Sequence, residues 1–305
     1  MTVSVVIETI TAREDAKGRL ADDIRGALEA LAKQTVPPDE VFVVVDDGVA
    51  QDAIDEIRRR HPHVRIIAGG PTYLAAKNAG AAAASSDAVA FLDGDCVPAP
   101  DWLEILLGRL EPGVDAVAGR TRYTGRSLFA RTLSVPDFAF VLEQESGTST
   151  GFNINNVVFR REVLLRHPFD VRIRRDGGCF FLFNQLRVAG ARVLYEPRAI
   201  VQHGFSTLRK TLGKHLNRGY DGVTVYRIDE RGVLRGSRWF RRFGALALVA
   251  LTGRRVVLDW IRMARHRRQI GIAAAALPYY CAVVIVTRSI ELAGGFAAIA
   301  RGKAA

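Results

Sequence analysis

The stretch AVAFLDGDCVPAPD, residues 88–101, decides how the fold is interpreted. Its first five residues are apolar throughout, as in a parallel strand that is covered on both faces. The run ends in Asp93 and Asp95, separated by Gly94, which can adopt the backbone angles of a tight turn. Two carboxylates on such a turn suit Mg²⁺ or Mn²⁺, which prefer oxygen ligands and leave positions for substrate phosphates. The alternative is a plain turn in which Asp95 or Asp101 only caps the next helix.

Short apolar runs recur along the first two thirds of the chain, and helical patterns separate them. The predicted strands cover 3–7, 41–45, 64–67, 88–92, 114–119, 155–160 and 191–195. The predicted helices cover 19–33, 51–60, 73–84, 101–110, 161–166 and 180–188. This alternation predicts right-handed βαβ units in a doubly wound α/β sheet.

Acidic residues follow three of these strands. Glu8 ends the first, Asp46 and Asp47 end the second, and Asp93 and Asp95 end the fourth. Ligands of open α/β sheets bind outside the carboxyl ends of the strands. The pattern therefore predicts a ligand site lined by carboxylates at that edge.

Five blocks of sequence, in order, resemble the family 2 glycosyltransferases with the GT-A fold over about residues 3–217. The blocks are VSVVIET, LEALAKQTVPPDEVFVVVDDG, AAKNAGAAAASSDAVAFLDGDCVPAPDWLE, NNVVFRREVL and VAGARVLYEPRAIVQHG. The resemblance implies a Rossmann-like, doubly wound mixed sheet that binds a nucleotide-diphosphate sugar. It also implies a metal-dependent, inverting transfer of that sugar to an acceptor.

The resemblance also implies roles for donor-side residues. Glu8, Asp46 and Asp47 are expected near the uracil or ribose of the nucleotide. Lys77 and Asn78, in the AAKNAG helix, match an Arg-Asn pair that supports the diphosphate. Lys77 could equally be a solvated helix lysine.

The metal site is expected to hold Mg²⁺ or Mn²⁺. Asp93 and Asp95 match the family's metal-binding Asp-x-Asp, and Asp93 also contacts the donor. His203, in VQHG, matches a histidine that relatives place close to the metal or diphosphate. An imidazole ligates Mn²⁺, whereas Mg²⁺ prefers oxygen.

The match fails at the general base. Counting back from Leu186 places Gly178 and Cys179 where inverting relatives carry a Glu-Asp pair. A neutral thiol among apolar neighbours is a poor base. Asp176, three residues before Cys179, is therefore the predicted base. Three alternatives are retention of configuration, an acceptor phosphate that is already ionised, and a protein that binds without turnover.

Acceptor recognition is assigned to Asn153, Asn156 and Cys179. The segment GFNINN precedes the strand where relatives line the sugar and acceptor cleft, and its amides suit hydroxyl recognition. At least one of these asparagines is expected to serve the loop itself. The apolar run that begins at Cys179 is either core packing or a contact with a lipid part of the acceptor.

The charge changes sign along the chain. Residues 1–200 carry 24 Lys/Arg and 27 Asp/Glu, whereas residues 201–305 carry 19 and 5, so a net −3 is followed by +14. In the second part, arginine clusters at 238–242 and 262–268 alternate with apolar runs at 243–251 and 271–287. This pattern is typical of helices on an anionic membrane surface and argues against nucleic acid as the partner.

We therefore predict two domains: a catalytic domain over 1–217 and a basic, helical membrane-associating region over 218–305. The run at 271–287 is marginal for crossing a bilayer. The expected location is the cytoplasmic face of the cell membrane, peripheral or with one short embedded helix. The three scattered cysteines fit a reducing compartment.

The predicted activity is non-processive transfer of one sugar to a lipid-linked or glycan acceptor, because no Gln-x-x-Arg-Trp motif follows His203. A sugar-phosphate nucleotidyltransferase would need a glycine-rich loop after the first strand, yet no glycine precedes Gly18. The non-catalytic alternative is a nucleotide-sugar-binding scaffold at the membrane.

Overall fold

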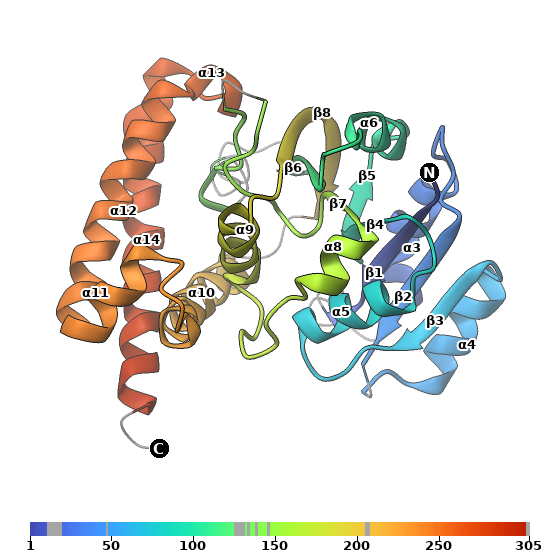
Figure 1. Cartoon of the computed structure of the whole chain (residues 1–305), viewed down its shortest axis with the longest axis horizontal. Helices are drawn as coiled ribbons and strands as arrows, with labels where there is room; N and C mark the ends of the chain where they lie inside the picture. Colours follow the sequence, from blue (N-terminus) through green and yellow to red (C-terminus); the bar gives the residue numbers. More distant parts are fainter. Residues whose placement is uncertain are drawn as a thin grey trace.

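The structure is a computed structural model of the whole chain. It describes residues 1–10, 20–46, 48–124, 132, 135–137, 140–144, 147–204 and 208–302. Figure 1 shows a sheet with flanking helices on one side of the molecule and a group of C-terminal helices on the other.

Eight strands form one mixed sheet in the order β3-β2-β1-β4-β7-β6-β8-β5. Their bounds are β1 (Val3–Glu8), β2 (Glu40–Val45), β3 (Val64–Ala68), β4 (Ala88–Asp93), β5 (Cys96–Pro98), β6 (Ala116–Tyr123), β7 (Val157–Arg160) and β8 (Val193–His203). The strands β1 to β4 are parallel, and β7 runs antiparallel to β4 and β6. The predicted mixed α/β sheet is confirmed.

Helices cover both faces of this sheet. Their bounds are α2 (Leu20–Asp23), α3 (Arg25–Leu31), α4 (Gln51–Arg60), α5 (Tyr73–Ala83), α6 (Trp102–Arg109), α8 (Arg161–Arg166) and α9 (Gly178–Val188). One buried apolar cluster joins the sheet to α2, α3, α4 and α6, and a second joins it to α5, α8 and α9. The apolar strands therefore lie in the middle of three layers, which explains why they lack polar alternation.

The predicted strand at 191–195 is longer in the structure, and β5 was not predicted. Strand β8 continues to His203 past a bulge. Gly119 of β6 pairs with Glu196, and the next residue, Arg120, pairs with Ile200, so residues 197–199 have no partner on β6. Pro197 lies in this bulge, where a strand tolerates a residue without an N–H. The extended end of β8 then pairs with β5, which is only three residues long.

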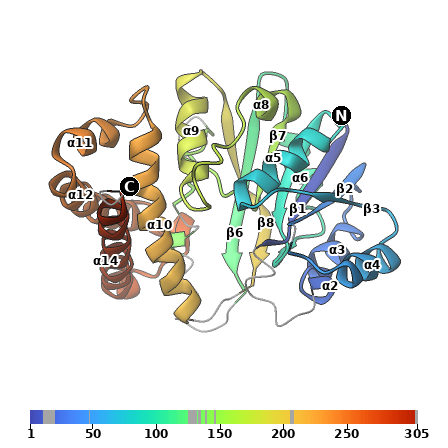
Figure 2. The same cartoon turned by 90° about the horizontal axis from the view of Figure 1, so that it is seen from below.

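The C-terminal part is helical. Its elements are α10 (Leu208–Ile228), α11 (Arg235–Phe243), α12 (Ala245–Arg265), α13 (Arg267–Ile270), a 3₁₀ turn (Ala274–Ala276) and α14 (Leu277–Arg301). Figure 2 shows α10 between the sheet and the other C-terminal helices. The domain boundary expected at residues 217 and 218 falls inside α10.

Helices α10 and α14 pack at backbone distance. A Cβ on Gly219 of α10 would lie 1.7 Å from the carbonyl oxygen of Glu291, and one on Gly294 of α14 would lie 1.9 Å from that of Leu216. Only glycine fits at these two positions, so α14 is held closely against the helix that adjoins the sheet.

One C-terminal helix meets the length and composition of a membrane span. It covers Ala274–Arg301 and so continues past the end of the apolar run at 271–287. In its most apolar stretch of 18 residues, 39% is buried inside the protein. Pro278 stands in the first turn of α14 and therefore does not interrupt it. Arg288 lies inside α14, where it is buried and paired with Asp259 of α12.

Candidate active site

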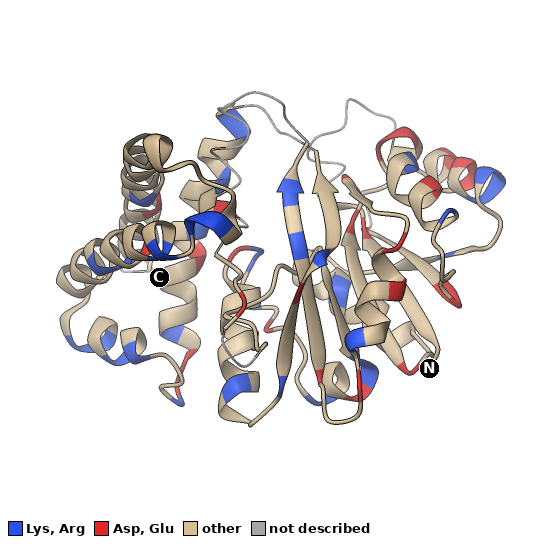
Figure 3. Cartoon of the chain, turned by 90° about the horizontal axis from the view of Figure 1, so that it is seen from above, with Lys and Arg blue, Asp and Glu red and all other residues tan. Residues whose placement is uncertain are grey.

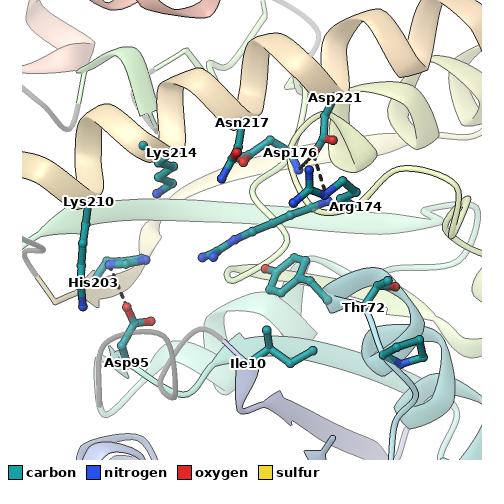
Figure 4. A pocket seen from close by; sticks show the side chains of 14 residues that line it. Ile10, Thr72, Asp95, Arg174, Asp176, His203, Lys210, Lys214, Asn217 and Asp221 are labelled. Atoms are coloured by element: carbon teal, nitrogen blue, oxygen red, sulfur yellow. Dashed lines mark hydrogen bonds and ion pairs between the residues drawn. The ribbon is translucent and has the colours of Figure 1, made fainter. Parts of the chain in front are cut away.

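A cavity of about 390 Å³ opens at the carboxyl ends of the parallel strands. Four parts of the chain line it: the ends of strands, the start of α5, the loop before α9, and one side of α10 (Figure 4). The lining residues are Ile10, Pro71, Thr72, Tyr73, Asp95, Arg174, Arg175, Asp176, His203, Lys210, Gly213, Lys214, Asn217 and Asp221. The sequence predicted three of them as site residues: Asp95, Asp176 and His203.

A group of metal-ligating side chains lies at one end of this cavity. Ligand atoms of Asp93, Asp95, Cys96 and His203 are within 4.8 Å of one another. The sheet brings them together, because Cys96 of β5 pairs in register with His203 of β8. Nδ1 of His203 lies 3.5 Å from Oδ2 of Asp95, and its ring packs edge-on against Tyr123.

The chemistry of this group fits a hard divalent cation. Burial and the neighbouring charge of Asp93 raise the pKa of Asp95, although His203 acts in the opposite direction. A divalent ion between the two carboxylates would remove that penalty. Burial also raises the pKa of the Cys96 thiol well above its usual value, which keeps it protonated. Asp93, Asp95 and His203 are therefore the candidate ligands.

Lys77 does not extend into solvent. Its ammonium is completely buried and donates to Oδ1 of Asp93 and to the carbonyl of Leu92, both at 2.8 Å. Tyr73 donates to the same Asp93 oxygen at 2.9 Å. Although burial alone would raise it, the pKa of Asp93 is lowered by the charge and hydrogen bond of Lys77. The alternative of a solvated lysine is wrong: here Lys77 keeps Asp93 ionised and oriented.

Two predicted ligand-binding amides are used inside the protein. Asn78 exchanges two hydrogen bonds with the backbone of Phe169, at 2.8 and 3.0 Å. Asn156 is completely buried, where it donates to the carbonyl of Ala199 and accepts from the indole of Trp102. Asn78 thus ties α5 to the loop at Phe169, and Asn156 ties the turn before β7 to β8 and α6. Their expected contacts with a diphosphate and an acceptor stay predictions.

The other predicted contacts lie outside the lining of the cavity. Glu8 is buried at the end of β1 beside Asp93, and Asp46 accepts from the N–H of Gly48. Asn153 is half-buried in the loop before β7. Their roles stay predictions, and Asp47 lies outside the described residues.

The position of the missing family carboxylate is filled by packing. Gly178 begins α9 against α5, and a Cβ on it would lie 2.6 Å from Cδ1 of Leu74. Burial raises the pKa of Cys179 to about 12, so its thiol is not a base at neutral pH. Neither residue offers a carboxylate or a thiolate to an acceptor.

Asp176 lies instead in the wall of the cavity, on the loop before α9. Its backbone N–H and that of Arg175 both donate to Oδ2 of Asp221, at 2.8 and 3.1 Å. Oδ1 of Asp176 is 3.7 Å from Nε of Arg218, and Oδ2 is buried and has no hydrogen-bond partner among the described residues. The structure therefore places a carboxylate in the cavity wall, which is a precondition for a general base.

The sequence did not reveal the contribution of α10. Lys210, Lys214, Asn217 and Asp221 recur at three- and four-residue steps, which puts them on one side of the helix, and they line the cavity. Figure 4 shows Lys210 and Lys214 pointing from α10 toward His203. That spacing was a usable signal, but the basic composition after residue 200 directed the interpretation toward a membrane surface.

Asp221, like Asp95, is a carboxylate of the cavity lining whose pKa is raised. Burial and the charge of Asp176 raise the pKa of Asp221 to about 6, against the two backbone hydrogen bonds that lower it. Through the two backbone hydrogen bonds that it accepts, Asp221 holds the loop that carries Arg174, Arg175 and Asp176.

Comparison with known proteins identifies relatives over most of the chain. The family model described as glycosyl transferase family 2 matches residues 10–167. Glycosyltransferase AglE of Haloferax volcanii is 34% identical over 242 residues, which are 76% of this chain and 77% of that protein. Glucosyl-dolichyl phosphate glucuronosyltransferase of the same organism is 26% identical over 227 residues, or 67% of this chain and 69% of that protein.

A solved structure agrees in fold. Mannosyltransferase PcManGT from Pyrobaculum calidifontis, in complex with GDP-Man and Mn²⁺, superposes with a TM-score of 0.64 at 19% identity, covering 97% of this chain and 86% of that one. The fold and the sequence relatives thus agree with the resemblance that the five sequence blocks indicate. The chain belongs to glycosyl transferase family 2.

Proposed function

We propose that this glycosyltransferase moves a single sugar, with a divalent metal ion, from a nucleotide-diphosphate sugar to a lipid-linked or glycan acceptor at a membrane surface. The observation that carries the metal dependence is the group of Asp93, Asp95 and His203 at the end of the cavity. Mn²⁺ or Mg²⁺ bound there would neutralise negative charge that develops on the departing diphosphate.

The protein supplies further positive charge from the opposite wall. Lys210 and Lys214 of α10 line the same cavity as Asp95 and His203. Because Lys77 is completely buried against Asp93 and does not line the cavity, we assign the direct contact with the diphosphate to Lys210 and Lys214, the latter also 3.5 Å from Oδ2 of Asp137. Cations fixed where charge develops stabilise a transition state more than the bound substrate.

Asp176 is the proposed base. It takes the proton from an acceptor hydroxyl, whose oxygen bonds to the anomeric carbon as the bond from that carbon to the diphosphate oxygen breaks. Attack from the side opposite the leaving group inverts the anomeric configuration. Removal of a general base costs about 100-fold to about 10,000-fold in rate.

The membrane assignment rests on the outer surface of α11 and α12. Trp239 and Phe243 on α11 and Leu246, Val257 and Ile261 on α12 are exposed although they are large and apolar. Figure 3 shows Lys and Arg distributed along these C-terminal helices. Apolar side chains flanked by arginines suit the headgroup region of an anionic membrane. A peripheral position on the cytoplasmic face is the corresponding proposal for localisation.

A relative's name supports the acceptor class. The glucuronosyltransferase of Haloferax volcanii is named for a glucosyl-dolichyl phosphate, which is a lipid-linked sugar. We therefore propose lipid-linked sugars as the first acceptors to be tested.

A transfer assay tests this function. Purified protein is incubated with a panel of nucleotide sugars, a lipid-linked or glycan acceptor and Mn²⁺, and the products are identified by mass spectrometry. We expect transfer with one class of donor, its loss in Asp95→Ala, and a decrease of at least about 100-fold in Asp176→Asn. Nucleotide binding without cleavage of any donor would instead support the non-catalytic scaffold.

A further inference from the structure

An ionic network lies between α10, α12 and α14, outside the cavity. Its charged side chains are mostly buried, and they bridge helices that are far apart in the sequence. Ion pairs join Asp137, His215, Arg218, Arg255, Asp259, Arg288 and Glu291. A buried network of this size is weak evidence for stability, because desolvation offsets most of the attraction. Its position next to the candidate base suggests another purpose.

Glu291 of α14 is the centre of this network. Its Oε1 accepts from Arg288 at 2.6 Å and lies 3.0 Å from Nδ1 of His215, and its Oε2 accepts from Arg255 at 3.0 Å. The same Oε1 lies 3.7 Å from Arg218 of α10. One carboxylate of α14 therefore faces basic side chains from three helices.

Arg218 connects this centre to the active site. Nη1 of Arg218 donates to Asp137 at 2.9 Å and faces Glu291, while its Nε faces Asp176 at 3.7 Å. The guanidinium is planar and rigid, so its two ends cannot move independently. The placement of one end by Asp137 and Glu291 sets the position of the other end beside Asp176.

We infer that Glu291 is a positioning residue for the transfer reaction, which it affects through Arg218 and Asp176. The C-terminal helix α14 is then a part of the catalytic architecture and not a separate anchor. Close backbone packing at Gly219 and Gly294 holds α14 near enough to α10 for Glu291 to face Arg218. The inference rests on the proposed role of Asp176 as the base.

The test compares Glu291→Gln, which removes the charge and keeps the shape, with Glu162→Gln, the same change in an exposed surface pair of α8. We expect Glu291→Gln to lower kcat by about tenfold to about 100-fold, as for a misplaced reacting group, with the KM for the donor close to wild type. Because the change also removes one partner of several buried ion pairs, the melting temperature should fall by about 8–16 °C, and kcat is measured well below it. Glu162→Gln should match wild type in all three. Unchanged turnover in Glu291→Gln would overturn the inference.

A double-mutant cycle separates this path from a general structural effect. In the Asp176→Asn background, Glu291→Gln should cause less than about a twofold further loss, because its target is already gone. A full second loss, so that the two effects multiply, would show that Glu291 does not act through Asp176. If Asp176→Asn alone leaves turnover unchanged, the proposed base is wrong and the inference fails with it, whereas failure of Glu291→Gln alone leaves the base intact.

Arg218→Lys covers the case in which Glu291→Gln does not fold. This substitution keeps the positive charge, but a single ammonium cannot contact Asp137 and Asp176 in the same fixed geometry. We expect a loss of kcat of about tenfold or more with the KM for the donor maintained. Wild-type kcat in this variant would overturn the role of Arg218 as the connection.

Discussion

Replacement of Lys77 by Met measures how far the metal-binding loop depends on one buried cation. The variant keeps the aliphatic chain but removes the ammonium, which is completely buried and donates to Asp93 and to the carbonyl of Leu92. Removing one partner of a buried ion pair costs about 3–5 kcal/mol, because it leaves the other charge without compensation. For a chain of this size, about 4 kcal/mol lowers the melting temperature by about 8–16 °C.

The assay is thermal unfolding followed by circular dichroism, with Lys33→Met as the control. Lys33 is an exposed lysine, so its replacement should change the unfolding free energy by less than about 0.5 kcal/mol. The double variant Lys77→Met/Asp93→Asn should recover part of the lost stability, because neither charge remains. A melting temperature of Lys77→Met within about 2 °C of wild type would refute the buried pair.

Three further predictions follow from the cavity wall and the outer helices. Gly178→Asp, which restores a family carboxylate, should lose about 1–3 kcal/mol of unfolding free energy in urea titration, because its Cβ meets Leu74; a stable variant would contradict this packing. Burial raises the pKa of Asp221 to about 6, so the stability that Asp221 contributes should be complete below about pH 4 and decline as pH rises through 6. The unfolding free energy of wild type should therefore fall more steeply between about pH 4 and 6 than that of Asp221→Asn, and the two should run parallel above about pH 7. Parallel curves between pH 4 and 6 would contradict this. Trp239→Ser/Leu246→Ser should bind vesicles with anionic lipid at least about fivefold more weakly than wild type by sedimentation, and equal binding would refute the membrane surface.

The sheet could be predicted from the sequence because most of its strands are encoded locally. Runs such as VSVVI and VFVVV are buried on both faces and carry their own signal. Strand β5 and the end of β8 carry no such signal, because one has three residues and the other follows a bulge at Pro197. That pairing is nevertheless what brings His203 beside the acidic loop.

The site could be predicted only where chemistry and local structure coincide. Asp93 and Asp95 stand directly after a buried strand, so their place at the sheet edge follows from the sequence. The burial of Lys77 could not be predicted, because a lysine in a helix is usually solvated and its contact with Asp93 is tertiary. The spacing of polar residues on α10 indicated one side of a helix, but the cavity that this side lines could not be predicted, because it forms only when α10 lies beside the sheet.

Metal-dependent binding of nucleotide tests the central claim most directly. Calorimetric titration with UDP and GDP, in Mn²⁺ and in EDTA, should give binding of at least one nucleotide that requires Mn²⁺ and is lost in Asp95→Ala. That result would show that Asp95 takes part in metal-dependent binding of the diphosphate, as the account requires. Binding of equal strength in EDTA, or Asp95→Ala indistinguishable from wild type in Mn²⁺, would contradict it.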